Sequence, residues 1–152
     1  LAWVIPLWFV RRRRDALDLI VLLALAEATV FVLKWTLAVP RPEIGVRVAV
    51  PFDDASDPAF PSGHATRAFA LALFLAVRGK DWRWGAALFP YAVLVAVSRV
   101  YVGVHWPSDV LAGALLGLAW AYALEGISRR PGYATRRDRL LARLSSAHRE
   151  GG

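Results

Sequence analysis

Two histidines lie where each can take part in nucleophilic or acid–base chemistry. His105 comes just before Trp106-Pro107, and Pro107 suits the first position of a helix. Asp109 then falls in the first turn of that helix, where its carboxylate can reach back to the His105 imidazole and fix its tautomer. With an unperturbed pKa of about 6.5, one histidine can attack phosphorus in its neutral form while a second, His64, protonates a leaving oxygen.

Cationic and small residues predict an anion site beside these histidines. Lys34, Arg41 and Arg99 would repel one another at one point unless a multiply negative ligand lay among them. Ser62 is a good N-cap for the helix that follows, whose free N–H groups and dipole attract an anion, and Gly63 allows close approach to the backbone. Pro61-Ser62-Gly63 alone is more typical of an ordinary helix start than of an anion site. The combination favours a phosphate-binding site.

Apolar segments must hold these residues in place, and they predict a membrane protein. Hydrophobic residues make up 57% of the 152 residues, above the roughly 45–50% of soluble domains. The first segment has about 24 residues and would span roughly 36 Å, enough to cross a hydrocarbon core of about 30 Å. We expect four crossings, at residues 16–39, 65–77, 85–104 and 110–127. Residues 1–10 are too short to span alone and predict the last turns of a truncated helix.

The 19 basic residues divide into two groups. Fourteen fall in residues 11–14, 78–83 and 129–149, which four antiparallel crossings put on one side, and the positive-inside rule makes that side cytoplasmic. The other five lie at or near the outer end: Lys34, Arg41, Arg47, Arg67 and Arg99. Charges near a span are costly, so these five are functional candidates, with snorkelling to the headgroups as the alternative. The net charge of +7 therefore predicts a bilayer and an anionic substrate as partners, and no nucleic acid.

Three ordered motifs resemble the signature of the type 2 phosphatidic acid phosphatase superfamily. They are Lys34 with six residues before Arg41-Pro42, Pro61-Ser62-Gly63-His64, and Ser98-Arg99 followed at fixed spacing by His105 and Asp109. The resemblance covers residues 34–109. It implies an all-α fold, a polytopic transmembrane helical bundle. The superfamily also has soluble relatives, the vanadium haloperoxidases, whose fold is a helical bundle of the same kind.

The resemblance also implies a role for each motif residue. His105 would be the nucleophile that forms a phosphohistidine, Asp109 its orienting carboxylate, and His64 the general acid for the leaving group. The phosphoryl group would be bound by Lys34, Arg41, Ser62, Gly63 and Arg99, and no metal or cofactor is needed. The absence of cysteine agrees with a nitrogen nucleophile, because it excludes a thiol nucleophile and cysteine-bound zinc.

We expect residues 1–152 to form a single membrane-embedded phosphatase domain. The chain begins with Leu1 and contains no Met, and members of the superfamily usually carry more helices, so we expect it to be truncated at its N-terminus. Residues 128–152 predict a basic cytoplasmic tail. We expect this tail to be frayed, with an amphipathic leucine face on anionic headgroups as the alternative.

Other features leave alternatives open. Glu27 is a functional candidate or an interhelical hydrogen-bond partner, and Arg67 can reach a phosphate, including the second phosphate of a diphosphate, or snorkel. The loop of residues 40–60 predicts a lid with four acidic residues: Glu43, Asp53, Asp54 and Asp57. Gly113 and Gly117 predict close helix packing, either within the fold or in a dimer.

These observations together predict an integral membrane lipid phosphatase with its site on the outer face. Candidate substrates are undecaprenyl diphosphate, phosphatidic acid and phosphatidylglycerophosphate. The alternatives are a lipid phosphotransferase that uses the same intermediate, a vanadate-dependent peroxidase, and an inactive lipid-binding module. The apolar walls of the site are generic, so the sequence does not select one lipid.

Overall fold

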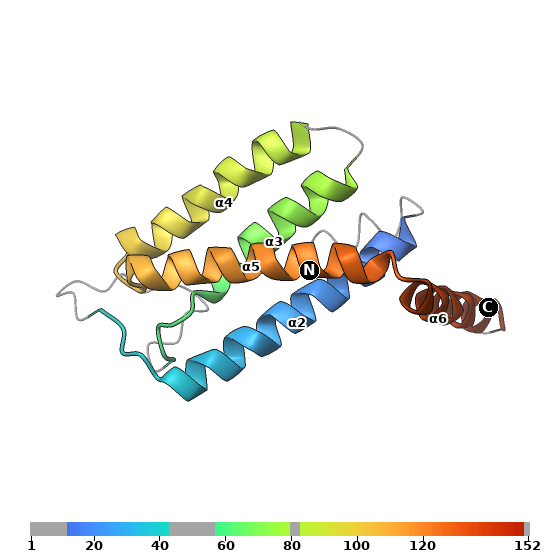
Figure 1. Cartoon of the computed structure of the whole chain (residues 1–152), viewed down its shortest axis with the longest axis horizontal. Coiled ribbons are helices and arrows are strands. Elements are labelled where there is room, and N and C mark those ends of the chain that lie inside the picture. Colours follow the sequence, from blue (N-terminus) through green and yellow to red (C-terminus); the bar gives the residue numbers. More distant parts are fainter. Residues whose placement is uncertain (1–11, 43–56, 80–82, 151–152) are drawn as a thin grey trace.

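The computed structural model describes residues 12–42, 57–79 and 83–150, and these residues form five helices and no strands (Figure 1). The helices are α2 (Arg13–Leu37), α3 (Gly63–Arg78), α4 (Arg83–Tyr101), α5 (Pro107–Ser128) and α6 (Pro131–Glu150). The first four follow the four predicted apolar segments with ends shifted by a few residues. Within the described residues, α2 and α5 are long and apolar enough to cross a membrane, and α4 contains a shorter apolar segment, Gly85–Tyr101.

Helices α3 and α5 form the centre of the bundle, with α2 and α4 on opposite sides of this pair (Figure 1). Two glycines of α5 make the central contact possible. A Cβ at Gly113 would collide with the carbonyl oxygen of Ser62, and one at Gly117 with the carbonyl oxygen of Thr66. The small-residue pair therefore packs within the fold, which decides between the two predicted alternatives.

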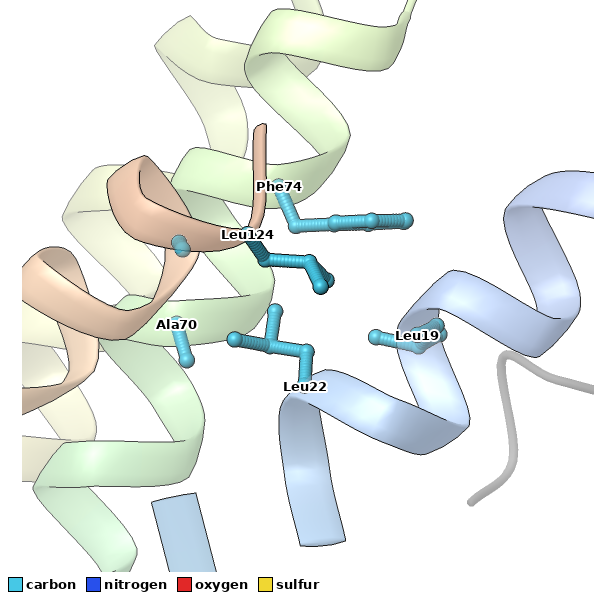
Figure 2. Close-up of a cluster of buried hydrophobic side chains, with 6 residues drawn as sticks. Leu19, Leu22, Ala70, Phe74 and Leu124 are labelled. Carbon is cyan, nitrogen blue, oxygen red and sulfur yellow. The ribbon is translucent and has the colours of Figure 1, made fainter. Parts of the chain in front are cut away.

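A hydrophobic cluster joins α2, α3 and α5 in the half of the bundle nearer α6 (Figure 2). Leu19 and Leu22 of α2 are fully buried, and they pack with Phe74 of α3 and Leu124 of α5. The outward faces are also apolar: Leu94 is 68% exposed, Tyr101 89% and Tyr122 79%. Such surfaces are unusual in water and suit a bilayer, which solvates apolar side chains.

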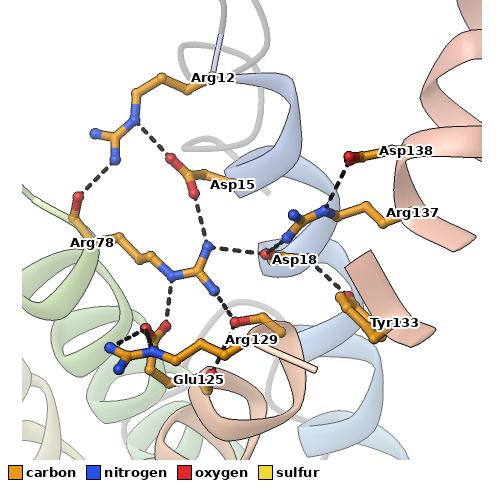
Figure 3. A network of polar contacts seen from close by, with 10 residues as sticks. Arg12, Asp15, Asp18, Arg78, Glu125, Arg129, Tyr133, Arg137 and Asp138 are labelled. Carbon is orange, nitrogen blue, oxygen red and sulfur yellow. Dashed lines mark hydrogen bonds and ion pairs between the residues drawn. The ribbon is translucent and has the colours of Figure 1, made fainter. Parts of the chain in front are cut away.

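A network of ion pairs closes the same end of the bundle (Figure 3). Arg78, at the end of α3, donates from Nη1 to Asp15 and Asp18 of α2, at 2.9 Å each. Its Nε donates to Glu125 of α5 at 2.6 Å, and its Nη2 to the Ser128 hydroxyl at 2.6 Å. One guanidinium thus ties three helices together through all of its nitrogens.

The same network docks the C-terminal segment, which corrects the prediction of a frayed tail. Asp18 is fully buried, and it accepts hydrogen bonds from the Tyr133 hydroxyl at 2.8 Å and from Arg137 Nη1 at 2.6 Å. Burial, followed by the hydrogen bond to Asp18, raises the pKa of Tyr133 to about 12. The phenol therefore stays a neutral donor at physiological pH, and α6 is held as an ordered helix.

Replacing Gly117 by alanine should destabilise the bundle. The added methyl group meets backbone atoms of α3, which cannot move aside without separating the two helices. We expect a loss of about 1–3 kcal/mol or more, measured as a lower midpoint of thermal unfolding in detergent. Gly126→Ala, in the same helix, is the matched control because nothing lies within 4 Å of its Cβ position. Equal midpoints for the two variants would contradict the packing argument.

The Asp18→Asn variant should release α6. Removing the charge leaves Arg78 and Arg137 without their shared buried carboxylate, a loss of about 3–5 kcal/mol for buried pairs in general. We expect trypsin to cleave the arginine-rich α6 much faster than in the wild type. Asp138→Asn is the control: Asp138 is 41% exposed and pairs with Arg14, which is 64% exposed, and with Arg137 only at 3.6 Å, and exposed pairs contribute little. Unchanged cleavage in Asp18→Asn would show that other contacts dock α6.

Candidate active site

The end of the bundle opposite α6 brings together the ends of α2 and α4 and the beginnings of α3 and α5 (Figure 1). Every residue predicted to form the site belongs to these four helix ends or to the adjoining turns: Lys34, Arg41, Ser62, Gly63, His64, Arg99, His105 and Asp109. Antiparallel packing of the helices is what gathers segments that are far apart in the sequence.

His105 and Asp109 form a buried pair at the beginning of α5. Their side chains are 2% and 1% exposed, and His105 Nδ1 lies 3.6 Å from Asp109 Oδ2. The same carboxylate oxygen accepts the backbone N–H of Trp106 at 2.8 Å, which caps the helix and fixes the carboxylate. Nδ1 is therefore the nitrogen turned toward the carboxylate, and Nε2 lies on the opposite edge of the ring.

A tight turn after α4 carries His105 and links it to Arg99. Gly103 adopts a left-handed conformation with φ of 73°, which favours glycine. The N–H of Gly103 donates to the Val100 carbonyl at 3.0 Å, and the N–H of Val104 donates to the Arg99 carbonyl at 3.2 Å. The position of His105 thus depends on the backbone of Arg99, one of the predicted phosphate-binding residues.

Ser62 joins the beginning of α3 to the beginning of α5. Its backbone N–H donates to the Asp109 carbonyl at 2.9 Å, and its own carbonyl accepts the Thr66 hydroxyl at 2.9 Å. Ser62 is fully buried and precedes α3 as predicted, but its hydroxyl makes no capping bond. This hydroxyl has no hydrogen-bond partner among the described residues. A buried unpaired hydroxyl is costly, so its position indicates a ligand site.

Gly63 and His64 follow in the first turn of α3. A Cβ at Gly63 would lie 3.5 Å from a methyl group of Val30, an ordinary contact, so α2 passes directly over this glycine. His64 is half-buried. The first N–H groups of a helix have no intrahelical acceptors, which makes this turn suitable for binding an anion.

Asp57 organises two of the predicted cations, a role that the sequence did not reveal. Arg41 is 8% exposed, and its Nε donates to the Asp57 carbonyl at 2.9 Å. Arg41 Nη1 reaches the carbonyl of Val104, next to His105, at 3.5 Å. Lys34 Nζ lies 3.6 Å from the Asp57 carboxylate. The only sequence signal for Asp57 was its place in an acidic loop.

Two further contacts complete the surroundings of the site. The Trp106 indole donates to the Pro40 carbonyl at 3.1 Å, which ties the beginning of α5 to the first residue of the loop. Arg67 of α3 pairs with Glu27 of α2 at 2.7 Å, so Glu27 is an interhelical partner, as one predicted alternative had it. The rest of the predicted lid, with Glu43, Asp53 and Asp54, and the basic residue Arg47 lie outside the described residues.

Comparisons with known proteins identify the family. The model of the PAP2 superfamily matches residues 15–131. The protein YbjG of Escherichia coli is 33% identical over 98% of this chain and 73% of its own length. An undecaprenyl-diphosphatase of Sulfolobus acidocaldarius is 38% identical over 72% of this chain and 53% of its own length.

Solved structures agree with this assignment. LpxE of Aquifex aeolicus superposes with a TM-score of 0.71 and 33% identity, over 82% of this chain and 74% of that one. A transmembrane PAP2-type phosphatidylglycerolphosphate phosphatase of Bacillus subtilis gives a TM-score of 0.67 and 30% identity, over 81% and 63%. The fold is that of the membrane-embedded PAP2 phosphatases, so the predicted all-α transmembrane bundle is confirmed.

The chain belongs to the PAP2 superfamily, the type 2 phosphatidic acid phosphatase superfamily that its three motifs resemble. It is an integral membrane protein of the lipid-phosphatase class. It spans 73% of the Escherichia coli relative and about half of the Sulfolobus relative, 53%.

Replacing Ser62 by alanine should weaken phosphate binding without destabilising the fold. The hydroxyl has no partner among the described residues, so its loss breaks no bond there. Hydrogen bonds to charged groups are worth about 1.5–3 kcal/mol, so inhibition by inorganic phosphate or vanadate should weaken roughly 10- to 100-fold. Thr66→Val is the control. It removes the hydrogen bond from the Thr66 hydroxyl to the Ser62 carbonyl, so we expect it to lower the midpoint of thermal unfolding more than Ser62→Ala does. Unchanged inhibition of Ser62→Ala would argue against a ligand at this hydroxyl.

Proposed function

We propose that this chain hydrolyses a phosphomonoester or diphosphate of a membrane lipid through a phosphohistidine on His105. The observation that carries the proposal is the buried His105–Asp109 pair beside the Ser62 hydroxyl, which has no hydrogen-bond partner in the described part of the chain. A nucleophile with its orienting carboxylate and an adjacent anion-binding turn are the parts that phosphoryl transfer requires.

In the first step, His105 Nε2 attacks phosphorus while Nδ1–H faces Asp109. The new N–P bond makes the ring positive, and the carboxylate 3.6 Å from Nδ1 stabilises that charge as the contact tightens. Lys34, Arg41 and Arg99 balance the charge on the phosphoryl oxygens. Ser62 and the first N–H groups of α3 add directional hydrogen bonds. This positioning and charge stabilisation supply most of the acceleration in phosphoryl transfer.

His64 serves the leaving group in the proposed mechanism. As the bond between phosphorus and the leaving oxygen breaks, its electron pair stays on that oxygen and His64 delivers a proton to it. The neutral His64 then accepts a proton from water as the water oxygen attacks the phosphorus of the phosphohistidine. The N–P bond breaks, its electron pair returns to His105 Nε2, and inorganic phosphate is released, so both histidines return to their starting states.

The surface around the site supports a lipid substrate in the bilayer. Large apolar side chains are exposed near it, including Trp35 at 57% and Trp106 at 46%. An apolar groove of about 490 Å³ runs between α3, α4 and α5 along Phe69, Val97 and Leu111. Undecaprenyl diphosphate, phosphatidic acid and phosphatidylglycerophosphate are the candidate substrates.

We further propose that the site faces outward and that α6 lies in the cytoplasm. The support is the distribution of basic residues, because the segments around Arg12, Arg78 and α6 meet at the end of the bundle away from the site. The Lys and Arg bias of short connections sets orientation in membranes.

The His105→Ala variant tests the proposed function. Without the imidazole no phosphohistidine can form, so we expect phosphate release from the candidate lipids to fall at least about 1,000-fold. The measurement is initial phosphate release in detergent, with acid-labile, alkali-stable phosphate on the protein as a second readout. His148→Ala, in α6 at the far end of the bundle, is the matched control. Full activity of His105→Ala would refute the mechanism.

A further inference from the structure

One ion pair beside the site has no role in the mechanism above. Arg67 Nη1 donates to both carboxylate oxygens of Glu27, at 2.8 and 2.7 Å, and joins α3 to α2. The two side chains are 43% and 49% exposed. Charged groups on helices within a membrane protein are costly and are retained where they serve binding or transport. The pair is therefore a candidate binding element.

The guanidinium of Arg67 lies against the anion-binding turn. Its Nη1 and Nη2 are 3.7 and 3.8 Å from the position that a Cβ of Gly63 would occupy. Glu27 engages Nη1, whereas Nη2 and Nε make no hydrogen bond among the described residues. Glu27 thus holds the guanidinium in place while two of its nitrogens keep N–H groups for another acceptor.

Arg67 is also a neighbour of the proposed general acid. It lies three residues after His64 on α3, and residues at this spacing are about 5–6 Å apart between Cβ atoms on a helix surface. The leaving oxygen must lie beside His64 to receive its proton. A group attached to that oxygen therefore comes within reach of the Arg67 guanidinium.

We propose that Arg67 binds the leaving phosphate of a lipid diphosphate and so makes the site selective for diphosphates over monoesters. The inference rests on the proposed function. A monoester leaves as a neutral alcohol, which needs no cation. A diphosphate leaves as a lipid monophosphate, and its negative charge develops where Arg67 lies.

In the proposed step, His105 attacks the terminal phosphorus of the lipid diphosphate and the lipid monophosphate leaves. The bond between His105 Nε2 and the terminal phosphorus forms, and the bond from that phosphorus to the bridging oxygen breaks. The electron pair stays on the bridging oxygen, which takes the proton of His64. Arg67 donates from Nη2 and Nε to the departing phosphate and keeps its Nη1 bonds to Glu27.

Two substrates with the same chain test the proposal. Initial phosphate release from farnesyl diphosphate and farnesyl monophosphate would be measured with the purified full chain in detergent. In Arg67→Gln we expect kcat/KM for the diphosphate to fall about 10- to 100-fold and that for the monophosphate to change much less. Equal loss on both substrates, or no loss on either, would overturn the proposal.

Variants of Glu27 provide the controls. Glu27→Gln keeps Arg67, so we expect a smaller diphosphate loss than in Arg67→Gln, and an equal loss would indicate a purely structural pair and overturn the proposal. The double variant Glu27→Gln/Arg67→Gln leaves no unpaired charge, so it should fold and show the same selective loss. If the wild type releases phosphate from neither farnesyl substrate but does so from phosphatidic acid or phosphatidylglycerophosphate, the diphosphate selectivity is overturned and the proposed function stands. If it releases phosphate from none of these lipids, the proposed function itself fails.

Discussion

The carbonyl oxygens of Ser62 and Thr66 lie directly against Gly113 and Gly117, and this contact sets how closely α3 and α5 approach. At that spacing, the N–H of Ser62 bonds the carbonyl of Asp109. The proposed anion-binding turn at the beginning of α3 is thereby fixed to the first turn of α5. Any side chain at the two glycines would separate the helices and move this turn away from the buried His105–Asp109 pair.

The two ends of the bundle use charge in different ways. At the α6 end, Arg78 meets the carboxylates Asp15, Asp18 and Glu125, so the charges compensate one another and lock helices together. At the site end, Arg41 donates to the backbone carbonyls of Asp57 and Val104, which position its guanidinium beside His105. The first arrangement locks three helices together, and the second sets the place of one predicted phosphate-binding side chain.

Asp109 and Ser62 each stabilise the fold and also belong to the proposed active site. The Asp109 carboxylate caps α5 through the Trp106 N–H and faces His105 with the same oxygen. The Ser62 backbone connects α3 and α5, while its buried hydroxyl has no partner among the described residues. Bonds that stabilise the helices thus also hold the groups of the proposed site in position before a substrate arrives, which lowers the cost of ordering them in the proposed reaction.

The sequence by itself determined the family and the helical membrane fold, and it predicted that the motif residues lie at one end of the bundle. Those features depend on local patterns: apolar segments long enough to span, Pro107 at a helix start, and fixed spacings from Lys34 to Asp109. Only the tertiary structure decided that Asp57 supports Lys34 and Arg41, that Glu27 holds Arg67, and that Asp18 docks α6. The physical reason is that these partners are brought together by helix packing, and an acidic residue in the sequence carries no sign of which distant cation it will meet.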